Sequence, residues 1–207
     1  TLIETIKWSP EEGFVLLGRH LARLLSSAAY FGLPADGAEA TARLMTESQA
    51  WTAPMRVRLT LSETGIEITA VPLPPNPAKF RFLIANEKLL SSSVWLAHKT
   101  TNRAFYDQPR IKAHDEHAVD EVLFLNERGE LTEGSITNLF IARGGKLLTP
   151  ALASGLLPGT LRAELIETGR AEEAILTLAD LQSADAIFLG NSVRGLIPAE
   201  LFEPEPS

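Results

Sequence analysis

Four prolines crowd into one short stretch of this chain and divide it into two parts. Pro72, Pro74, Pro75 and Pro77 lie within six residues. Proline lacks a backbone N–H and fixes its own φ angle, so neither a helix nor a central strand can run through this stretch. The chain has 207 residues, which suits one large domain or two small ones. We therefore predict a small domain over residues 1–74 and a larger one over residues 78–207.

Hydrophobic spacing predicts a mixed α/β (α+β) fold on both sides of the prolines. Before them, helical spacing favours helices over 18–32 and 35–50, and strict alternation favours a hairpin of strands over 55–61 and 66–71. After them, strands are expected over 93–98, 121–126, 138–142, 146–148 and 186–189. A helix is expected from residue 161 to a Gly169 cap, and a short helix opens at Thr177 with capping-box spacing.

Composition excludes several classes of function. The chain has 19 Lys and Arg against 26 Asp and Glu, a formal net charge of −7, and no basic block, so no nucleic-acid partner is expected. Its longest apolar runs are too short to span a bilayer, and its first residues do not form a signal peptide. The absence of cysteine removes disulfides, thiol nucleophiles and zinc–thiolate sites. We expect a soluble, acidic, cytoplasmic protein without a membrane partner.

Three features of the chain each suit an anion. Gly159 and Thr160 stand at a predicted helix start, where backbone N–H groups and the positive end of the helix dipole meet. Asn191 and Ser192 form a polar turn directly after a buried strand, and Arg23 lies halfway along the first helix. Each is also compatible with a plain connection or a solvated arginine. Together they suit a phosphate.

Two ionisable residues are candidates for chemistry. Lys99 follows an apolar segment, and a lysine held against a buried sheet has a lowered pKa that suits Schiff-base or general-base work. The plainer interpretation is a strand-end lysine that reaches solvent. Glu133 stands between two apolar strands, either as a buried acceptor with a specific partner or as an edge-strand charge. No metal site is expected from residues 114–117, because consecutive residues seldom converge on one ion.

Several short motifs follow one another along almost the whole chain. They include residues 3–6 (Ile-Glu-Thr-Ile), 98–103 (His-Lys-Thr-Thr-Asn-Arg), 132–138 (Thr-Glu-Gly-Ser-Ile-Thr-Asn), 157–162 (Leu-Pro-Gly-Thr-Leu-Arg) and 190–195 (Gly-Asn-Ser-Val-Arg-Gly). In this order they resemble the class IV, fold-type IV pyridoxal-phosphate enzymes. That family includes the branched-chain and D-amino-acid aminotransferases and 4-amino-4-deoxychorismate lyase, and the segments 98–103 and 190–195 are most similar to the lyase.

The resemblance implies a site for pyridoxal 5′-phosphate. Lys99 matches the lysine in Schiff-base linkage with the cofactor, and Glu133 matches the carboxylate that hydrogen-bonds the pyridine nitrogen. The residues that match the phosphate cup are Arg23, Gly159, Thr160, Leu161, Asn191 and Ser192. The resemblance also implies a small N-terminal α/β domain, a larger barrel-like domain, a cofactor in the crevice between them, and a homodimer. Because relatives begin with an extra strand pair, the small domain is expected to be N-terminally shortened.

The resemblance implies a small-molecule substrate but leaves the reaction open. The leading expectation is a lyase that converts 4-amino-4-deoxychorismate to pyruvate and 4-aminobenzoate, a folate precursor. A branched-chain or D-amino-acid aminotransferase is the alternative. A catalytically silent relative is disfavoured, since Lys99 and Glu133 are both present. Substrate carboxylates are expected at Lys7, Arg103 and Arg194, with Arg56 and Arg58 either as further candidates or simply solvated.

Overall fold

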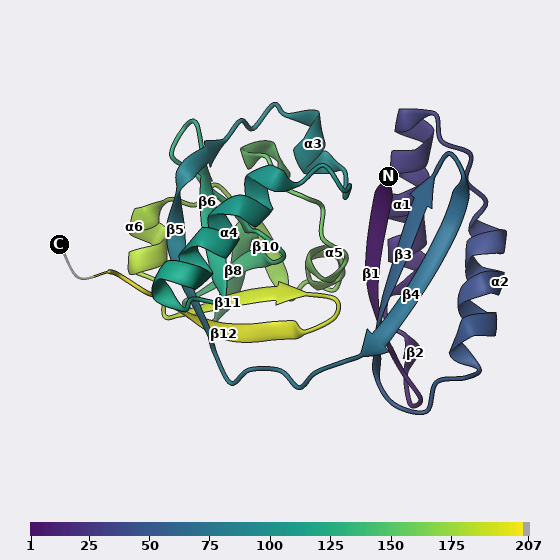
Figure 1. Cartoon of the computed structure of the whole chain (residues 1–207). Coiled ribbons are helices and arrows are strands. Elements are labelled where there is room, and N and C mark those ends of the chain that lie inside the picture. The colour runs from purple at the N-terminus through teal and green to yellow at the C-terminus, as the bar shows by residue number, and fades with distance from the viewer. Residues whose placement is uncertain (205–207) are drawn as a thin grey trace. The chain divides into compact units, whose positions relative to one another are not determined.

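The computed structural model describes residues 1–204, and these divide into two compact units (Figure 1). The first unit comprises Thr1–Pro75 together with His98–Asn102, and the second comprises Asn76–Ala97 and the chain from Arg103 onward. The division at Pro75 lies inside the proline-rich segment. Residues His98–Asn102 are an exception to a simple division at the prolines. They belong to the first unit, because Thr100 pairs with Leu2.

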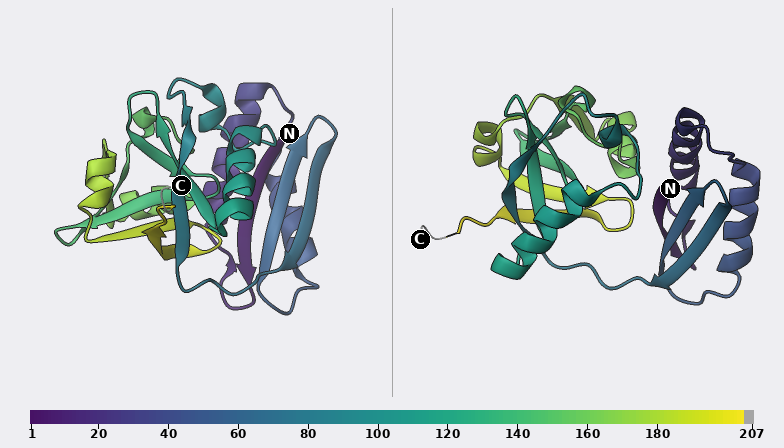
Figure 2. Two further views of the ribbon diagram at one scale, coloured as in Figure 1. Left: turned by 60° about the vertical axis from the view of Figure 1, so that its left-hand side comes forward. Right: turned by 45° about the horizontal axis from the view of Figure 1, so that its top comes forward.

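The first unit is a four-stranded antiparallel sheet with both of its helices packed on one face (Figure 2). Its strand order is β2-β1-β3-β4. The elements are β1 (Leu2–Ser9), β2 (Gly13–Phe14), α1 (Leu17–Phe31), α2 (Gly37–Ser48), β3 (Met55–Ser62) and β4 (Gly65–Pro72). Alternate strand residues such as Ile6 and Leu59 pack against Leu24 and Leu44 of the helices. The two predicted helices and the predicted hairpin are confirmed.

The second unit is built on an eight-stranded sheet in the order β10-β9-β8-β11-β12-β5-β6-β7. Its strands are β5 (Phe80–Leu89), β6 (Glu121–Asn126), β7 (Leu131–Gly134), β8 (Asn138–Arg143), β9 (Lys146–Pro150), β10 (Ala171–Ala174), β11 (Ala186–Asn191) and β12 (Gly195–Leu201). Because β7 also pairs with β8, the strands from β8 round to β7 close into a barrel. Phe82, Leu123, Leu139 and Leu189 belong to its core.

Helices lie between these strands along the chain. They are α3 (Val94–Ala97), α4 (Ala104–His117), a 3₁₀ helix (Leu152–Ser154), α5 (Thr160–Glu167) and α6 (Leu178–Gln182). The predicted capping box at Thr177 is present, with Asp180 as its second member. Within residues 1–204, no helix is both long enough and apolar enough to cross a membrane. The mixed α/β (α+β) fold with a barrel-like second part is therefore confirmed.

The prediction of a strand over residues 93–98 is wrong. This stretch contains the single helical turn α3, in which the N–H of Leu96 donates to the carbonyl of Ser93 at 3.2 Å. A short apolar run has the same composition in a strand and in a buried helical turn, so periodicity could not separate the two. Helix α4 was not predicted, because it contains Pro109 and has almost no apolar face.

A cluster of charged side chains ties the β6–β7 turn to a neighbouring loop. Ser91 donates its N–H and its hydroxyl to Glu127, at 2.8 and 2.6 Å. Arg128 donates to Glu127 at 2.9 Å and to Glu130 at 2.8 Å. The hydrogen bonds from Ser91 lower the pKa of Glu127 to about 2. Those from Arg128 and Asn126 lower the pKa of Glu130 to about 2.

We expect this cluster to stabilise the protein at mildly acidic pH. Both folded-state pKa values lie below the ordinary 4.5, so the contribution is complete above about pH 4.5 and is lost as the pH falls toward about 2. Arg128→Gln lets the pKa of Glu130 rise and should flatten this dependence of the free energy of unfolding. Urea denaturation across this pH range measures it. Equal slopes in Arg128→Gln and in the exposed control Arg170→Gln would contradict the prediction.

Candidate active site

Glu133, near the end of β7, is a buried carboxylate surrounded by hydrogen-bond donors. It is 4% exposed. The hydroxyl of Tyr106 and the backbone N–H of Leu157, the latter at 2.9 Å, both donate to its Oε1. The side-chain Nδ2 of Asn138 donates to its Oε2 at 3.5 Å. Of the two interpretations that the sequence left open, the buried acceptor with specific partners is the one observed.

Tyr106, on α4, is the partner that sequence reasoning missed. Burial raises the pKa of Tyr106, and the adjacent charge of Glu133 raises it further, so its hydroxyl stays protonated and donates. The guanidinium of Arg103 lies over its ring, 5.8 Å from the centroid. A buried tyrosine needs a partner for its hydroxyl. The role of Tyr106 as a donor to Glu133 depends on helix α4, which was not predicted from the sequence.

Helix α5 begins close to Glu133, since Leu157 donates its N–H to that carboxylate. The N-cap residue of the helix is Gly159, which has no side chain to make a capping hydrogen bond. A Cβ at residue 159 would overlap Oδ1 of Asn138, so glycine is what lets the helix start approach β8. The Nδ2 of Asn138 also donates to the carbonyl of Leu157 at 3.2 Å. The positive end of the helix dipole thus stands beside the buried carboxylate region.

The turn between β11 and β12 carries the other predicted residues of the phosphate cup. Oδ1 of Asn191 accepts from the N–H groups of Val193 and Arg194, both at 3.0 Å, and shapes the turn. Ser192 is 8% exposed. A Cβ on Gly190 would lie 3.2 Å from the side chain of Leu161, so this strand end packs against α5. The second unit therefore brings together Glu133, Gly159, Thr160, Leu161, Asn191 and Ser192.

Arg23 belongs to the first unit, where Glu4 holds its side chain. Its Nε and Nη2 donate to the carboxylate of Glu4 at 2.8 and 2.6 Å, and Nδ1 of His20 lies 2.6 Å from the same group. Burial alone raises the pKa of Glu4, but the charge and hydrogen bonds of Arg23, together with His20, lower it below its usual value. Glu4 shares the apolar face of β1 with Leu2 and Ile6. That break in the alternation was the signal that could have found it.

Lys99 also belongs to the first unit and follows α3. Its backbone carbonyl accepts from the N–H of Ile3 at 2.9 Å. The preceding residue, His98, contacts Ser27 through Nδ1 at 2.9 Å and lies against the ring of Tyr30. Burial lowers the pKa of His98. Strand β1 therefore holds the backbone at Lys99, and α1 holds the side chain of the preceding residue.

Two cations predicted to bind substrate are engaged with neighbouring carboxylates. Nζ of Lys7 lies 2.6 Å from Glu12. Nε of Arg103 lies 2.9 Å from Asp107, and its Nη2 donates to the carbonyl of Ser135 at 2.7 Å. In each pair a carboxylate of the protein already balances the positive charge that would attract a substrate carboxylate.

The remaining candidate cations lie in different settings. Nη1 of Arg194 is 3.3 Å from Oδ1 of Asn76. Arg56 and Arg58 are exposed on β3, on the sheet face opposite the helices, and their side chains make no hydrogen bond or ion pair with residues 1–204. They are thus available to an external anion.

The histidines of α4 have neighbours within their own helix region. Nδ1 of His114 lies 3.0 Å from the carbonyl of Val119, and Nε2 of His117 is 3.9 Å from Glu116. Across the part of the chain that the structure describes, no group of three or more His, Asp or Glu side chains is arranged to hold a metal ion.

Comparison with known proteins decides the family. Residues 1–202 match the amino-transferase class IV family. The chain is a class IV aminotransferase family member. A fission yeast (Schizosaccharomyces pombe) protein named "Putative aminodeoxychorismate lyase" is 30% identical over 99% of this chain and 91% of its own length. A Mesorhizobium loti crystal structure titled "Putative amino-acid aminotransferase" is 45% identical, with a TM-score of 0.88, and the match covers 97% of this chain and 99% of that one.

A third likeness bears on the fold alone. The crystal structure of a "Putative 4-amino-4-deoxychorismate lyase" from Legionella pneumophila has a TM-score of 0.85 at 23% identity, over 97% of this chain and 82% of that chain. The match extends over both units of this chain. The family predicted from the short sequence segments is confirmed.

Class IV aminotransferases are pyridoxal-phosphate enzymes, and the second unit fits that group. A buried carboxylate such as Glu133 is a suitable acceptor for a protonated ring nitrogen. At the start of α5, Asn138 leaves no room for a side chain on residue 159. The backbone N–H groups of this helix start suit a phosphate. The predicted cofactor is thus confirmed for the family, and this chain carries residues that can hold it.

We expect Gly159→Ala to weaken pyridoxal-phosphate binding by at least about tenfold, because the new methyl group displaces Asn138 or the start of α5. Titration of the cofactor-free enzyme, followed by absorbance, measures the dissociation constant. Gly18→Ala is the matched control, since a Cβ there meets nothing within 4 Å in a helix. Equal dissociation constants for the two variants would contradict the prediction.

Proposed function

We propose that this class IV enzyme is a lyase that converts 4-amino-4-deoxychorismate into 4-aminobenzoate and pyruvate. The observation that carries the proposal is the similarity to the fission yeast protein of that name, which extends over nearly the full length of both chains. A lyase of this name from Saccharomyces cerevisiae is 27% identical over 75% of this chain. The family resemblance also leads us to propose that the enzyme works as a homodimer.

The residues of this chain take separate roles in the proposed site. Pyridoxal phosphate, when bound, supplies an electron sink for the charge left by a departing proton. We assign Glu133 to the ring nitrogen, where its buried charge keeps that nitrogen protonated. We assign Lys99 to the covalent link with the cofactor. The phosphate is assigned to Arg23, Gly159, Thr160, Leu161, Asn191 and Ser192.

The proposed reaction needs one proton transfer by Lys99 and no second substrate. With the cofactor bound, the free Lys99 amine would take the hydrogen from the ring carbon that carries nitrogen. As the ring becomes aromatic, the ether bond to the enolpyruvyl group would break, and the proton would pass to the methylene carbon of the departing group, which leaves as pyruvate. All atoms of the substrate are found in 4-aminobenzoate and pyruvate, so neither water nor a keto acid is consumed.

The proposed substrate carries two carboxylates, and β3 offers two cations for them. Arg56 and Arg58 project from the same face of the strand, and neither side chain has a hydrogen-bond or ion-pair partner within residues 1–204. In the sheet, Arg56 stands opposite Lys7 and Arg58 stands opposite Thr5. We propose Arg56 and Arg58 as carboxylate ligands, ahead of Lys7, Arg103 and Arg194. The latter three are already engaged by Glu12, Asp107 and Asn76.

An amino-acid aminotransferase is the second candidate. The observation that favours it is the 45% identity to the Mesorhizobium loti protein, whose title names an amino-acid aminotransferase. A Thermotoga maritima protein named "Probable branched-chain-amino-acid aminotransferase" is 29% identical over 91% of this chain. Lys99 and Glu133 serve both reactions, since the first proton removal is shared. The two differ in the need for a keto acid acceptor.

The product test separates the candidates. Cofactor-loaded enzyme given 4-amino-4-deoxychorismate without any keto acid should release 4-aminobenzoate and pyruvate in equal amounts over many turnovers. An aminotransferase would stop after one turnover per site, because its cofactor keeps the amino group. Chromatography of the ring product and an enzymatic pyruvate assay measure the two. Release limited to one equivalent, with turnover restored by adding a keto acid, would favour the aminotransferase.

Two substitutions test the assigned roles. Lys99→Ala should abolish the absorbance band of the linked cofactor while far-ultraviolet circular dichroism stays unchanged, because only the linking amine is lost.

Glu133→Ala should still bind the cofactor but turn over at least about a hundredfold more slowly, since the ring nitrogen loses its anionic partner. An unchanged band in Lys99→Ala, or near-normal turnover in Glu133→Ala, would refute the respective assignment.

A further inference from the structure

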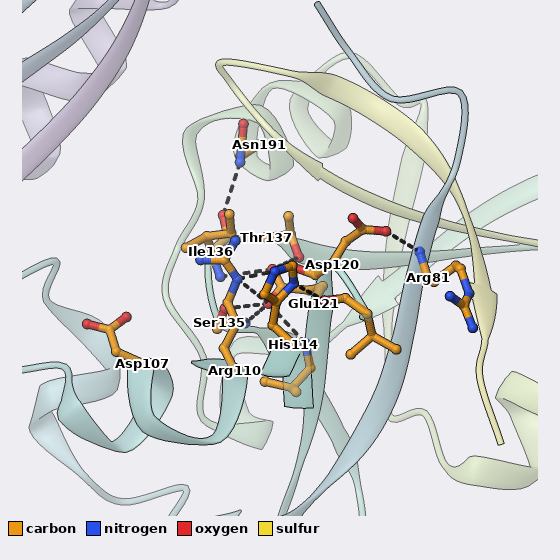
Figure 3. A network of polar contacts seen from close by, with 12 residues as sticks. Arg81, Asp107, Arg110, His114, Asp120, Glu121, Ser135, Ile136, Thr137 and Asn191 are labelled. Carbon is orange, nitrogen blue, oxygen red and sulfur yellow. Dashed lines mark hydrogen bonds and ion pairs between the residues drawn. The ribbon is translucent and has the colours of Figure 1, made fainter. Parts of the chain in front are cut away.

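Glu121 is a buried carboxylate that the proposed reaction does not use. It begins β6 and is 1% exposed. Its Oε1 accepts from the N–H groups of Val122 and Ser135, both at 3.0 Å, and from the hydroxyl of Ser135. Its Oε2 accepts from the N–H of Ile136 at 3.1 Å and from the hydroxyl of Thr137 at 3.0 Å (Figure 3). Each of these groups donates to an oxygen of the carboxylate.

Most of these donors belong to the short connection between β7 and β8. The connection reverses the chain so that Glu133 pairs with Asn138, and Gly134 donates to the carbonyl of Thr137 at 2.8 Å. The N–H of Ser135 is shared between the carboxylate of Glu121 and the carbonyl of Val122, the latter at 3.2 Å, and the N–H of Ile136 donates to Glu121. A Cβ on Gly134 would overlap the hydroxyl of Thr137 and lie 3.0 Å from that carboxylate. Glu121 thus holds the connection from close by.

The clamped connection reaches two other parts of the candidate site. The carbonyl of Ile136 accepts from Nδ2 of Asn191 at 3.1 Å, which ties it to the β11–β12 turn (Figure 3). The carbonyl of Ser135 accepts from Nη2 of Arg103 at 2.7 Å, at the start of the helix that carries Tyr106. One carboxylate therefore supports the segments that present Glu133, Asn191 and Tyr106.

The charged neighbours of Glu121 do not replace this role. Nε of Arg110 lies 4.0 Å from Oε1 of Glu121 and donates instead to the carbonyl of Asp120 at 3.1 Å. The adjacent carboxylate of Asp120 accepts from the N–H of Arg81, on β5. The hydrogen bonds that Glu121 accepts are the ones that shape the β7–β8 connection.

We propose that Glu121 is a positioning residue of the cofactor site. It fixes the β7–β8 connection, and through that connection it orients Glu133 and anchors Asn191 without touching the cofactor itself. This inference rests on the assignment of Glu133 and Asn191 to the cofactor under the proposed function. Loss of the clamp should weaken cofactor binding by more than the loss of fold stability explains, because strands β6, β7 and β8 keep their own pairing.

Glu121→Gln tests the proposal, because it keeps the shape of the side chain but replaces one acceptor oxygen with an NH₂ group, which cannot accept from the surrounding donors. We expect the dissociation constant for pyridoxal phosphate to rise at least about tenfold and the absorbance maximum of the bound cofactor to shift. Glu121→Asp, which keeps the charge, should restore part of the affinity. Titration of the cofactor-free protein followed by absorbance gives both readouts, and the thermal midpoint of the same samples monitors the fold.

Glu130→Gln is the matched control. Glu130 is another carboxylate of the same unit that accepts several hydrogen bonds, from Asn126, Arg128 and Ser154, and it holds a loop outside the candidate site. It should lower the thermal midpoint but leave the dissociation constant unchanged. An unchanged dissociation constant in Glu121→Gln, or an equal rise in both variants, would overturn the proposal.

Three further variants keep the result interpretable. If Glu121→Gln does not fold, Thr137→Val removes a single donor and should raise the dissociation constant about threefold, and no change there overturns the proposal. Asn191→Ala and Glu133→Ala test the assignments themselves. If the first leaves binding unchanged and the second leaves turnover unchanged, the cofactor site is misassigned and both proposals fail. If they have their expected effects while Glu121→Gln has none, only the positioning role fails.

Discussion

The tight reversal between β7 and β8 is the constraint on which the second unit depends. Glu133 pairs with Asn138 across it, and this pairing closes the barrel. A carboxylate at such a point is removed from water, which costs free energy unless donors surround it. Tyr106 and Leu157 supply those donors to Glu133, and Glu121 supplies acceptors to the reversal itself. Barrel closure and the polar geometry of the candidate site are therefore one arrangement.

The first unit applies the same physical rule at a different place. Glu4 stands on the strand face that alternation assigns to the core, and it is 1% exposed. Arg23 and His20 compensate its charge, and the pairing in turn fixes the direction of the Arg23 guanidinium. In each unit, therefore, a buried carboxylate orients a residue that the family resemblance associates with the cofactor.

Periodic segments could be predicted from the sequence, and segments without a period could not. The helix expected over 18–32 is observed as Leu17–Phe31, and the strand expected over 121–126 as Glu121–Asn126. Helix α4 escaped because Pro109 and its polar composition leave no apolar stripe, and α3 was mistaken for a strand because a brief apolar run has no readable period. Lys99 and Glu133 were candidates from their positions in the sequence, and the resemblance to the family gave them their roles. Their partners came only from the structure.

The sequence by itself determined where the periodic elements lie and which family the chain joins, because both are written in local spacing and in short ordered motifs. The tertiary structure alone decided which donors satisfy the buried charges. The partners in these contacts are distant along the chain: Arg23 is 19 residues from Glu4, and Tyr106 is 27 residues from Glu133. Only folding brings such groups within hydrogen-bond distance, so no local pattern could announce them.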